Sequence, residues 1–304
     1  HYFCAQFMYQ EEANITIERM TFSSKISAYT ALMKLRLAWL VVFSAVLGYM
    51  LAPGEIVWID LLFLGAGGFL VTGSSNSFNQ IWEKDLDKKM DRTKNRPMPL
   101  GKVSVVEALV FSSLIGIIGV LSLWQLNPLS AILGMLALAS YVLIYTPLKT
   151  ITPLSVFVGA FPGSVPPMLG YVAASGGFGL EAGILFLTQF FWQFPHFWSI
   201  AWKLHDDYQK GGFWMLPSLG GRDKKSAYQI LLYTAALIPV GMLPWVIDMT
   251  GVISAYFSII FGILMCIPAY KLYKTLDTKF AKQLMFGSFL YLPLMLIVYL
   301  IDKT

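Results

Sequence analysis

Four residues with oxygen-bearing side chains recur at intervals of four near the end of a long apolar stretch. Asn79, Glu83, Asp87 and Asp91 form this acidic row in the segment NQIWEKDLDKKMDRTKNRP, which ends at Pro97. On an α-helix a spacing of four turns the chain by roughly 400°, so each side chain lies about 40° around from the last and about 6 Å further along. The spacing therefore predicts a row of hard oxygen ligands on one helix face.

Basic residues follow the acidic row directly, at Arg92, Lys94 and Arg96. Carboxylates and amide oxygens bind hard divalent cations, whereas Arg and Lys bind phosphate oxygens. Asn79 and Asp87 would lie about 12 Å apart along a helix, and Mg²⁺–oxygen bonds are only about 2.0–2.1 Å long, so one ion cannot be held by both. The pattern predicts a diphosphate substrate that bridges one or two Mg²⁺ ions.

The composition places this site in a membrane. Apolar residues make up 57% of the chain, charged residues only 13%, and the mean hydropathy is +0.64. Too few polar groups exist to cover a soluble domain. We therefore expect an all-α membrane protein of nine transmembrane helices, because runs long enough to cross roughly 30 Å of hydrocarbon fall at 37–53, 56–82, 105–124, 127–147, 152–174, 180–202, 227–248, 251–270 and 283–301.

The basic residues predict the orientation. With nine helices and a cytoplasmic N-terminus, 21 of the 22 Lys and Arg residues fall on the cytoplasmic side and only Lys303 falls outside. The acidic row then faces the cytoplasm. The net charge of +5 is explained by short loops beside anionic lipid, so we do not expect nucleic-acid binding.

The sequence predicts a tail followed by one membrane domain. Residues 1–27 are expected to form a cytoplasmic or interfacial tail, and residues 28–304 a single domain. The tail has neither the pattern of a secretory signal nor that of a mitochondrial transit peptide, which favours a bacterial cytoplasmic membrane. Cys4 and Cys266 lie far apart in sequence and show neither a metal-binding pattern nor an expected disulfide.

A second polar helix end follows the sixth apolar run, in the segment WKLHDDYQKGG. It carries Lys203, His205, Asp206, Asp207 and Tyr208. We expect this segment and the acidic row to form two halves of one site, with Asp207 holding the diphosphate from the far side and Lys203 neutralising it. His205 is expected to be solvated.

Each feature has a plainer interpretation. Charged residues at a helix end usually form a solvated cap, but Asn79 and Glu83 precede the charge-rich stretch, where polar groups are costly unless they face a cavity. Asp91 fits a cap of the following turn as well as a ligand. His196, in WQFPHFW, shares a helix face with Gln193 and follows Pro195, which loosens the backbone. A packing role and a ligand role for His196 both stay open.

Several motifs together carry a resemblance to a known family. They are the acidic row with RTKNRP, YTPLKTITP from Tyr145, GAFPGSVPPMLG from Gly159, WQFPHF from Trp192, and DDY with MLP at Met215. This set resembles the protohaem IX farnesyltransferases, a branch of the UbiA-type intramembrane prenyltransferases. The resemblance extends from the first apolar run to about Pro217.

The resemblance implies nine helices around a lateral cavity, with two Asp-rich motifs at its cytoplasmic mouth. It implies Mg²⁺-dependent transfer of a farnesyl group from farnesyl diphosphate to a vinyl group of haem b, with water addition, to give haem O for terminal oxidases. Haem A synthase or a terminal-oxidase assembly would then be candidate partners. In the superfamily the first motif is Asn-xxx-Asp-xxx-Asp, so Glu83 takes the middle position. The second motif has acids four apart, and here Lys203 replaces the first of them, before Asp207.

The expected roles divide into three groups. The metal ligands are Asn79, Glu83, Asp87, Asp91, Asp206 and Asp207, of which Asn79, Glu83, Asp87 and Asp207 are also counted as catalytic, together with His196. The diphosphate side comprises Arg92, Lys94, Arg96, Tyr145, Lys149 and Lys203, and the haem side comprises Gln193 and His196.

Three alternatives remain. A quinone-type aromatic prenyltransferase would share the metal site but should have two acids in the second motif. A transporter should place ionisable groups near the bilayer midplane, whereas these acids cluster at one mouth. A structural subunit of a respiratory assembly would leave the acidic row unexplained.

Overall fold

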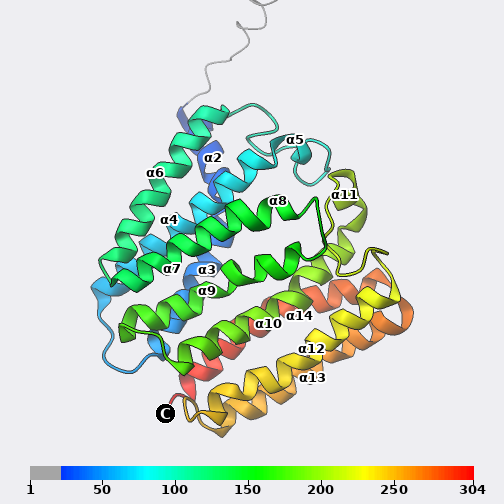
Figure 1. Cartoon of the computed structure of the whole chain (residues 1–304). Coiled ribbons are helices and arrows are strands. Elements are labelled where there is room, and N and C mark those ends of the chain that lie inside the picture. Colours follow the sequence, from blue (N-terminus) through cyan, green and yellow to red (C-terminus); the bar gives the residue numbers. More distant parts are fainter. Residues whose placement is uncertain (1–21) are drawn as a thin grey trace, which may run out of the picture.

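The protein folds into a bundle of long helices (Figure 1). The structure is a computed structural model that describes residues 22–304, so Cys4 and most of the expected tail lie outside the described part. Each of the nine apolar runs coincides with a helix or a run of helices: α3 (Leu35–Leu51), α4 (Trp58–Trp82), α6 (Val105–Trp124), α7 (Pro128–Ala139) continued by η1 (Ser140–Tyr145) and α8 (Thr146–Leu148), α9 (Ser155–Ser175), α10 (Leu180–Lys203), α12 (Lys224–Val246), α13 (Val252–Thr275) and α14 (Thr278–Ile301).

Short helices lie at the ends of these long ones: α2 (Phe22–Met33), α5 (Lys84–Asp87) and α11 (His205–Lys210). Within residues 22–304, seven spans are long and apolar enough to cross a membrane, and α2 with α3 forms an eighth candidate that is bent by 47°. Helix α10 is not among them, and it buries two glutamines and a histidine. The described chain is therefore an all-α membrane fold with seven or eight candidate spans.

Helix contacts define the order of the bundle. Helix α4 packs against α3 and α6, while α9 lies among α3, α7 and α10. Helix α12 packs against α10 and α13, and α14 contacts α13, α10 and α3. Among the candidate spans α9 has the largest buried share. The helices on either side of α9 and α10 therefore enclose these two.

Small residues let α3 and α9 approach backbone to backbone. A Cβ atom added at Gly48 would collide with the carbonyl of Pro167, and one added at Gly170 would collide with the carbonyl of Ala45. Close backbone approach through small residues is a common way to pack helices in lipid, where burial of apolar surface gives no net drive. We call this contact the glycine seam.

The joint between α2 and α3 is built from polar contacts. Lys34 adopts a left-handed conformation with φ of 53°, which is rare for a residue with a side chain. The amide of Asn76 donates to the carbonyl of Met33 at 3.1 Å, and the amide of Gln80 donates to the carbonyl of Leu32 at 2.9 Å. These side chains of α4 satisfy carbonyls in the last turn of α2, so the bend is part of the fold.

Candidate active site

The first three members of the acidic row share one buried face, although the helix that carries them is interrupted. Helix α4 ends at Trp82, and Glu83 departs from helical geometry before α5 begins. The backbone N–H of Glu83 still donates to Asn79 at 2.9 Å, and that of Asp87 donates to Glu83 at 2.7 Å. The one-turn spacing therefore continues across the break, and the three side chains are 1%, 3% and 0% exposed.

Glu83 forms a buried ion pair with Lys149, which follows α8. The Lys149 Nζ atom lies 2.7 Å from Glu83 Oε1, 4.4 Å from the ring centre of Tyr145 and 5.9 Å from that of Phe213. Burial alone would raise the pKa of Glu83, but the Lys149 ammonium outweighs it and holds this pKa below its ordinary value. Burial likewise opposes charge on Lys149, yet the Glu83 carboxylate raises the pKa of Lys149. Both groups are therefore charged at neutral pH.

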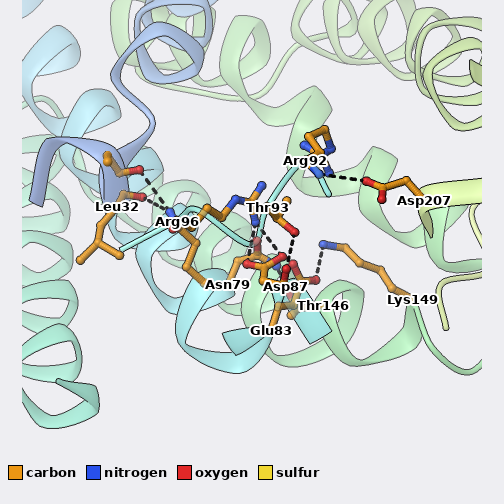
Figure 2. Close-up of polar contacts among 12 residues, drawn as sticks. Leu32, Asn79, Glu83, Asp87, Arg92, Thr93, Arg96, Thr146, Lys149 and Asp207 are labelled. Carbon is orange, nitrogen blue, oxygen red and sulfur yellow. Dashed lines mark hydrogen bonds and ion pairs between the residues drawn. The ribbon is translucent and has the colours of Figure 1, made fainter. Parts of the chain in front are cut away.

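Asp87 is bound by the loop that follows it. One Arg96 nitrogen, Nη1, lies 3.0 Å and 2.8 Å from the two carboxylate oxygens of Asp87, and the Thr93 hydroxyl donates to the Asp87 carbonyl at 2.9 Å (Figure 2). Burial raises the pKa of Asp87, and the neighbouring Arg96 only partly offsets this. The Arg96 side chain is 18% exposed, whereas that of Asp87 is fully buried. Arg96 thus reaches from the acidic row toward solvent.

Asn79 is oriented by η1 and α8, which continue α7. Its amide nitrogen donates to the Thr146 hydroxyl at 3.2 Å, and this hydroxyl donates to the Tyr141 carbonyl at 2.9 Å. Tyr141 lies in η1, a π-helical turn whose wider hydrogen-bond spacing is often found at functional sites. Because the nitrogen of Asn79 is engaged, its oxygen is the atom left to face a cation.

Asp207 and Asp91 belong to a second cluster. The Asp207 carboxylate accepts the backbone N–H groups of Asp91 at 2.7 Å and Arg92 at 3.2 Å. The Asp91 carboxylate is bound by Lys210 and, at 2.8 Å, by Lys94. Hydrogen bonds from Lys210 and Lys94 lower the pKa of Asp91 to about 2. The structure therefore brings Asp207 and Asp91 to each other.

Two further predicted residues lie outside both clusters. Asp206 pairs with Arg222 at 3.1 Å, and Arg222 also donates to the Trp202 carbonyl at 2.7 Å, near the end of α10. The Lys203 side chain is exposed and makes no ion pair with any residue in 22–304. The structure thus does not gather Asp206 or Lys203 with the acidic row. His205 is half-buried, so part of its surface is open to solvent.

The predicted haem-side residues are held by neighbouring helices. The Gln193 amide donates to the Ser164 hydroxyl of α9 at 2.7 Å. The His196 Nδ1 atom lies 2.9 Å from the Ser288 hydroxyl oxygen of α14, and the imidazole stacks on Trp192 with ring centres 4.4 Å apart. Both side chains are buried. His196 therefore combines aromatic packing with one defined polar contact.

The sequence reasoning missed Lys34. The Lys34 side chain interacts electrostatically with those of Glu83, Asp87, Arg96 and Lys149. Lys34 also lines a hollow of about 500 Å³ together with Ser27, Thr30, Ala31, Leu35, Arg36 and Leu37. The available signal was the pair of basic residues just before the first apolar run, Lys34 and Arg36. From the sequence alone this pair indicates only the orientation in the membrane. Thr93, Thr146 and Ser288 were missed as well, because only tertiary contacts reveal their roles.

The chemistry of the acidic row decides which metal it suits. Within residues 22–304 no group of three or more His, Cys, Asp or Glu side chains is arranged to hold a metal ion. The three buried members of the row offer two carboxylates, those of Glu83 and Asp87, and the amide oxygen of Asn79. Mg²⁺ is typically bound through one or two carboxylates plus substrate phosphates. These donors therefore fit a Mg²⁺ ion that shares its coordination with a diphosphate.

Comparison with known proteins agrees with this arrangement. A profile of the UbiA prenyltransferase family matches residues 41–292. The chain belongs to the UbiA prenyltransferase family. A UbiA-family relative from Christiangramia forsetii, described as protoheme IX farnesyltransferase, is 49% identical over 92% of this chain and 95% of its own length.

Solved structures show the same UbiA fold. A digeranylgeranylglyceryl phosphate synthase has a TM-score of 0.76 at 20% identity, covering 91% of this chain and 98% of that protein. A UbiA homologue from Archaeoglobus fulgidus, solved with GPP and Mg²⁺ bound, has a TM-score of 0.61 at 13% identity, covering 85% and 99%. At these identities the likeness concerns the fold alone.

Proposed function

We propose that this protein is a Mg²⁺-dependent intramembrane prenyltransferase that transfers the farnesyl group of farnesyl diphosphate to a vinyl group of haem b, giving haem O. The observation that carries the proposal is the buried row of Asn79, Glu83 and Asp87 with Lys149 and Arg96 beside it. Such a set suits a diphosphate held by metal and cations. The name of the Christiangramia forsetii relative supports the choice of haem and farnesyl as the two substrates.

Asn79, Glu83 and Asp87 would hold the Mg²⁺, as the Archaeoglobus fulgidus homologue binds Mg²⁺ together with a prenyl diphosphate. The ion supplies charge neutralisation, which makes diphosphate a better leaving group. Lys149 and Arg96 lie against the two carboxylates, so they would be beside the phosphate oxygens of a diphosphate bound to the same metal. Arg92, Lys94 and Lys203 stay predicted contacts of the diphosphate from the surrounding loops. Like Glu83 and Asp87, the remaining predicted ligands would each exchange a present partner for the metal; they are Asp91, Asp206 and Asp207.

Loss of diphosphate from an allylic carbon leaves a delocalised carbocation, which needs π-faces and limited water around it. The buried ring of Tyr145 lies under the Lys149 ammonium, close to where the leaving group would be. The haem vinyl group is the proposed nucleophile, and water then adds to the resulting cation. On the acceptor side, Gln193 and His196 are proposed to hold the porphyrin.

The proposal includes a topology. All nine long helices would span the membrane, with α10 shielded inside the bundle and the N-terminus in the cytoplasm. Residues 28–304 would form one domain with a lateral cavity open to lipid, in a bacterial cytoplasmic membrane. Haem A synthase or a terminal-oxidase assembly stays the predicted partner.

A single assay tests the proposal. Purified protein is incubated with haem b, farnesyl diphosphate and Mg²⁺, and haem O is sought by mass. We expect product only when all three are present and none after chelation of the metal. Parallel incubations replace haem b by a hydroxybenzoate, which a quinone-type enzyme would prenylate. Prenylation of that acceptor without haem O would reject haem as the substrate, and no prenylation of either would reject the proposed activity.

A further inference from the structure

Helix α11 is joined to the loop after Asp87 through the carboxylate of Asp207. Both oxygens of Asp207 face backbone N–H groups, those of the consecutive residues Asp91 and Arg92, at 2.7 Å and 3.2 Å. Figure 2 shows the contact with Arg92. Asp207 and these residues lie more than a hundred positions apart in sequence. A carboxylate that accepts two backbone N–H groups makes charge-assisted bonds that fix the backbone itself.

Two further contacts join the same segments. The Lys210 ammonium pairs with the Asp91 carboxylate, and the Arg92 guanidinium lies 5.6 Å from the ring centre of Tyr208. Three residues of α11 thus hold two consecutive residues of the loop. We call the contacts of Asp207, Tyr208 and Lys210 with residues 91–92 the clamp.

The loop held by the clamp also contacts Asp87. From Arg92 the loop continues to Thr93, whose hydroxyl donates to the Asp87 carbonyl, and to Arg96, whose guanidinium holds the Asp87 carboxylate. The position of the two arginines relative to Asp87 therefore depends on the backbone at 91–92. If the Asp207 carboxylate turned toward a metal ion, both N–H groups would lose their acceptor.

We infer that Asp207 is a positioning residue, which holds residues 91–96 so that Arg92 and Arg96 face the diphosphate, and that it does this without a bound metal. The substrate in this statement rests on the proposed function, whereas the clamp does not. A role as metal ligand would instead make the effect of Asp207 depend on Mg²⁺.

Hydrogen exchange separates the two roles. Full-length protein in detergent, free of divalent metal, is compared with the Asp207→Asn and Asp207→Ala variants. The Asn amide keeps one acceptor but places its NH₂ group against the other N–H. We expect amide exchange in residues 88–96 to be faster by roughly tenfold or more in both variants, because a charge-assisted bond is lost. Asp206→Asn is the matched control, since Asp206 pairs with Arg222, and it should leave exchange in this segment unchanged.

Substrate measurements give the second readout. We expect Asp207→Asn to raise the KM for farnesyl diphosphate more than it lowers kcat, with the Mg²⁺ concentration for half-maximal rate unchanged. Lys210→Met, which removes the clamp contact with Asp91 but leaves Asn79, Glu83 and Asp87 in place, should shift the KM in the same direction. Unchanged exchange in metal-free Asp207 variants, or a raised Mg²⁺ requirement without faster exchange, would overturn the inference. Should the protein fail to make haem O, the exchange result still decides whether the clamp exists.

Discussion

The His196 Nδ1 atom lies 2.9 Å from the Ser288 hydroxyl oxygen, and the same hydroxyl lies 2.7 Å from the Met285 carbonyl oxygen. A hydroxyl has one hydrogen, so Ser288 accepts from His196 when it donates to Met285. This arrangement places the imidazole proton on Nδ1 and leaves the lone pair on Nε2. An imidazole fixed in this way is the form that binds iron.

Ser288→Ala should therefore weaken haem b binding by about 10–100-fold, because it removes the group that orients the imidazole. Binding is measured from the haem absorption spectrum, and farnesyl diphosphate binding serves as the internal comparison and should stay intact. Ser112→Ala is a suitable control, since its buried hydroxyl bonds only to its own helix. An unchanged haem spectrum in both Ser288→Ala and His196→Ala would reduce His196 to a packing residue.

The buried pair of Glu83 and Lys149 should show strong coupling in a double-mutant cycle. Lys149→Met leaves Glu83 buried without its partner, and Glu83→Gln does the same to Lys149, so each should lower stability by about 3–5 kcal/mol. The double variant should recover much of that loss, although neither the single nor the double variants should make haem O. Thermal unfolding in detergent gives the stabilities. Additive losses would show that the two side chains act independently.

The same pair predicts a pH dependence. The pKa of Glu83 is held below its ordinary value, so its contribution is complete above the unfolded-state pKa and is lost as pH falls through the folded-state pKa. The pKa of Lys149 is raised, so its contribution is complete below the unfolded-state pKa and is lost as pH rises through the folded-state pKa. Between about pH 5 and 10 the pair should keep its full effect. The double variant should lose less stability than the native protein when acidified.

Asp87→Asn should separate activity from stability. Burial raises the pKa of Asp87 despite Arg96, which means that the charged form is costly in the folded protein. Removing the charge while keeping the shape should change the unfolding temperature little, yet haem O formation should fall by at least a hundredfold because a metal ligand is lost. A large drop in unfolding temperature would show that Asp87 mainly holds the loop through Arg96.

Lys34→Gly tests the residue that the sequence did not flag. Glycine adopts the left-handed conformation at no steric cost, so the bend between α2 and α3 should persist and stability should change by no more than about 1 kcal/mol. Removal of the Lys34 amine should nevertheless raise the KM for farnesyl diphosphate. Lys34→Arg keeps the charge and should recover much of the affinity, while Lys25→Ala, on α2 and paired with Glu107, should have no effect. Equal losses in the Gly and Arg variants would point to the backbone.

The sequence predicted the features that depend on local residue patterns, namely the positions of the long helices and the shared face of the acidic residues. Apolar runs located the long helices within residues 22–304 to within about five residues, although only seven or eight of them are candidate spans. A spacing of four placed Asn79, Glu83 and Asp87 on one face, even across the break at Glu83. The motifs could not predict which residue each acidic side chain contacts. Asp206 and Asp207 are neighbours in sequence, yet one pairs with Arg222 and the other with the backbone at 91–92.

The break at Lys34 was not predictable for a related reason. Neither Gly nor Pro marks it, and the amides that satisfy the freed carbonyls come from α4, more than forty residues away. Residue types at the bend therefore carry no local signal. The same holds for Ser288, whose importance comes only from its contact with a helix that lies 92 positions earlier.

Because of the glycine seam, some parts of the molecule should accept far fewer substitutions than others. Where Gly48 and Gly170 meet opposing carbonyls, any side chain would push two backbones apart, so this part of the bundle tolerates no gradual change. In the loops around 88–104 and 203–223, a Cβ atom added at Gly211 or Gly221 would instead meet a side chain, that of Met90 or His205, and side chains give way more easily than an opposing backbone. Divergence toward other prenyl acceptors or donors is therefore expected to begin at the mouth of the bundle, while the spacing of α3 and α9 stays fixed across the lineage.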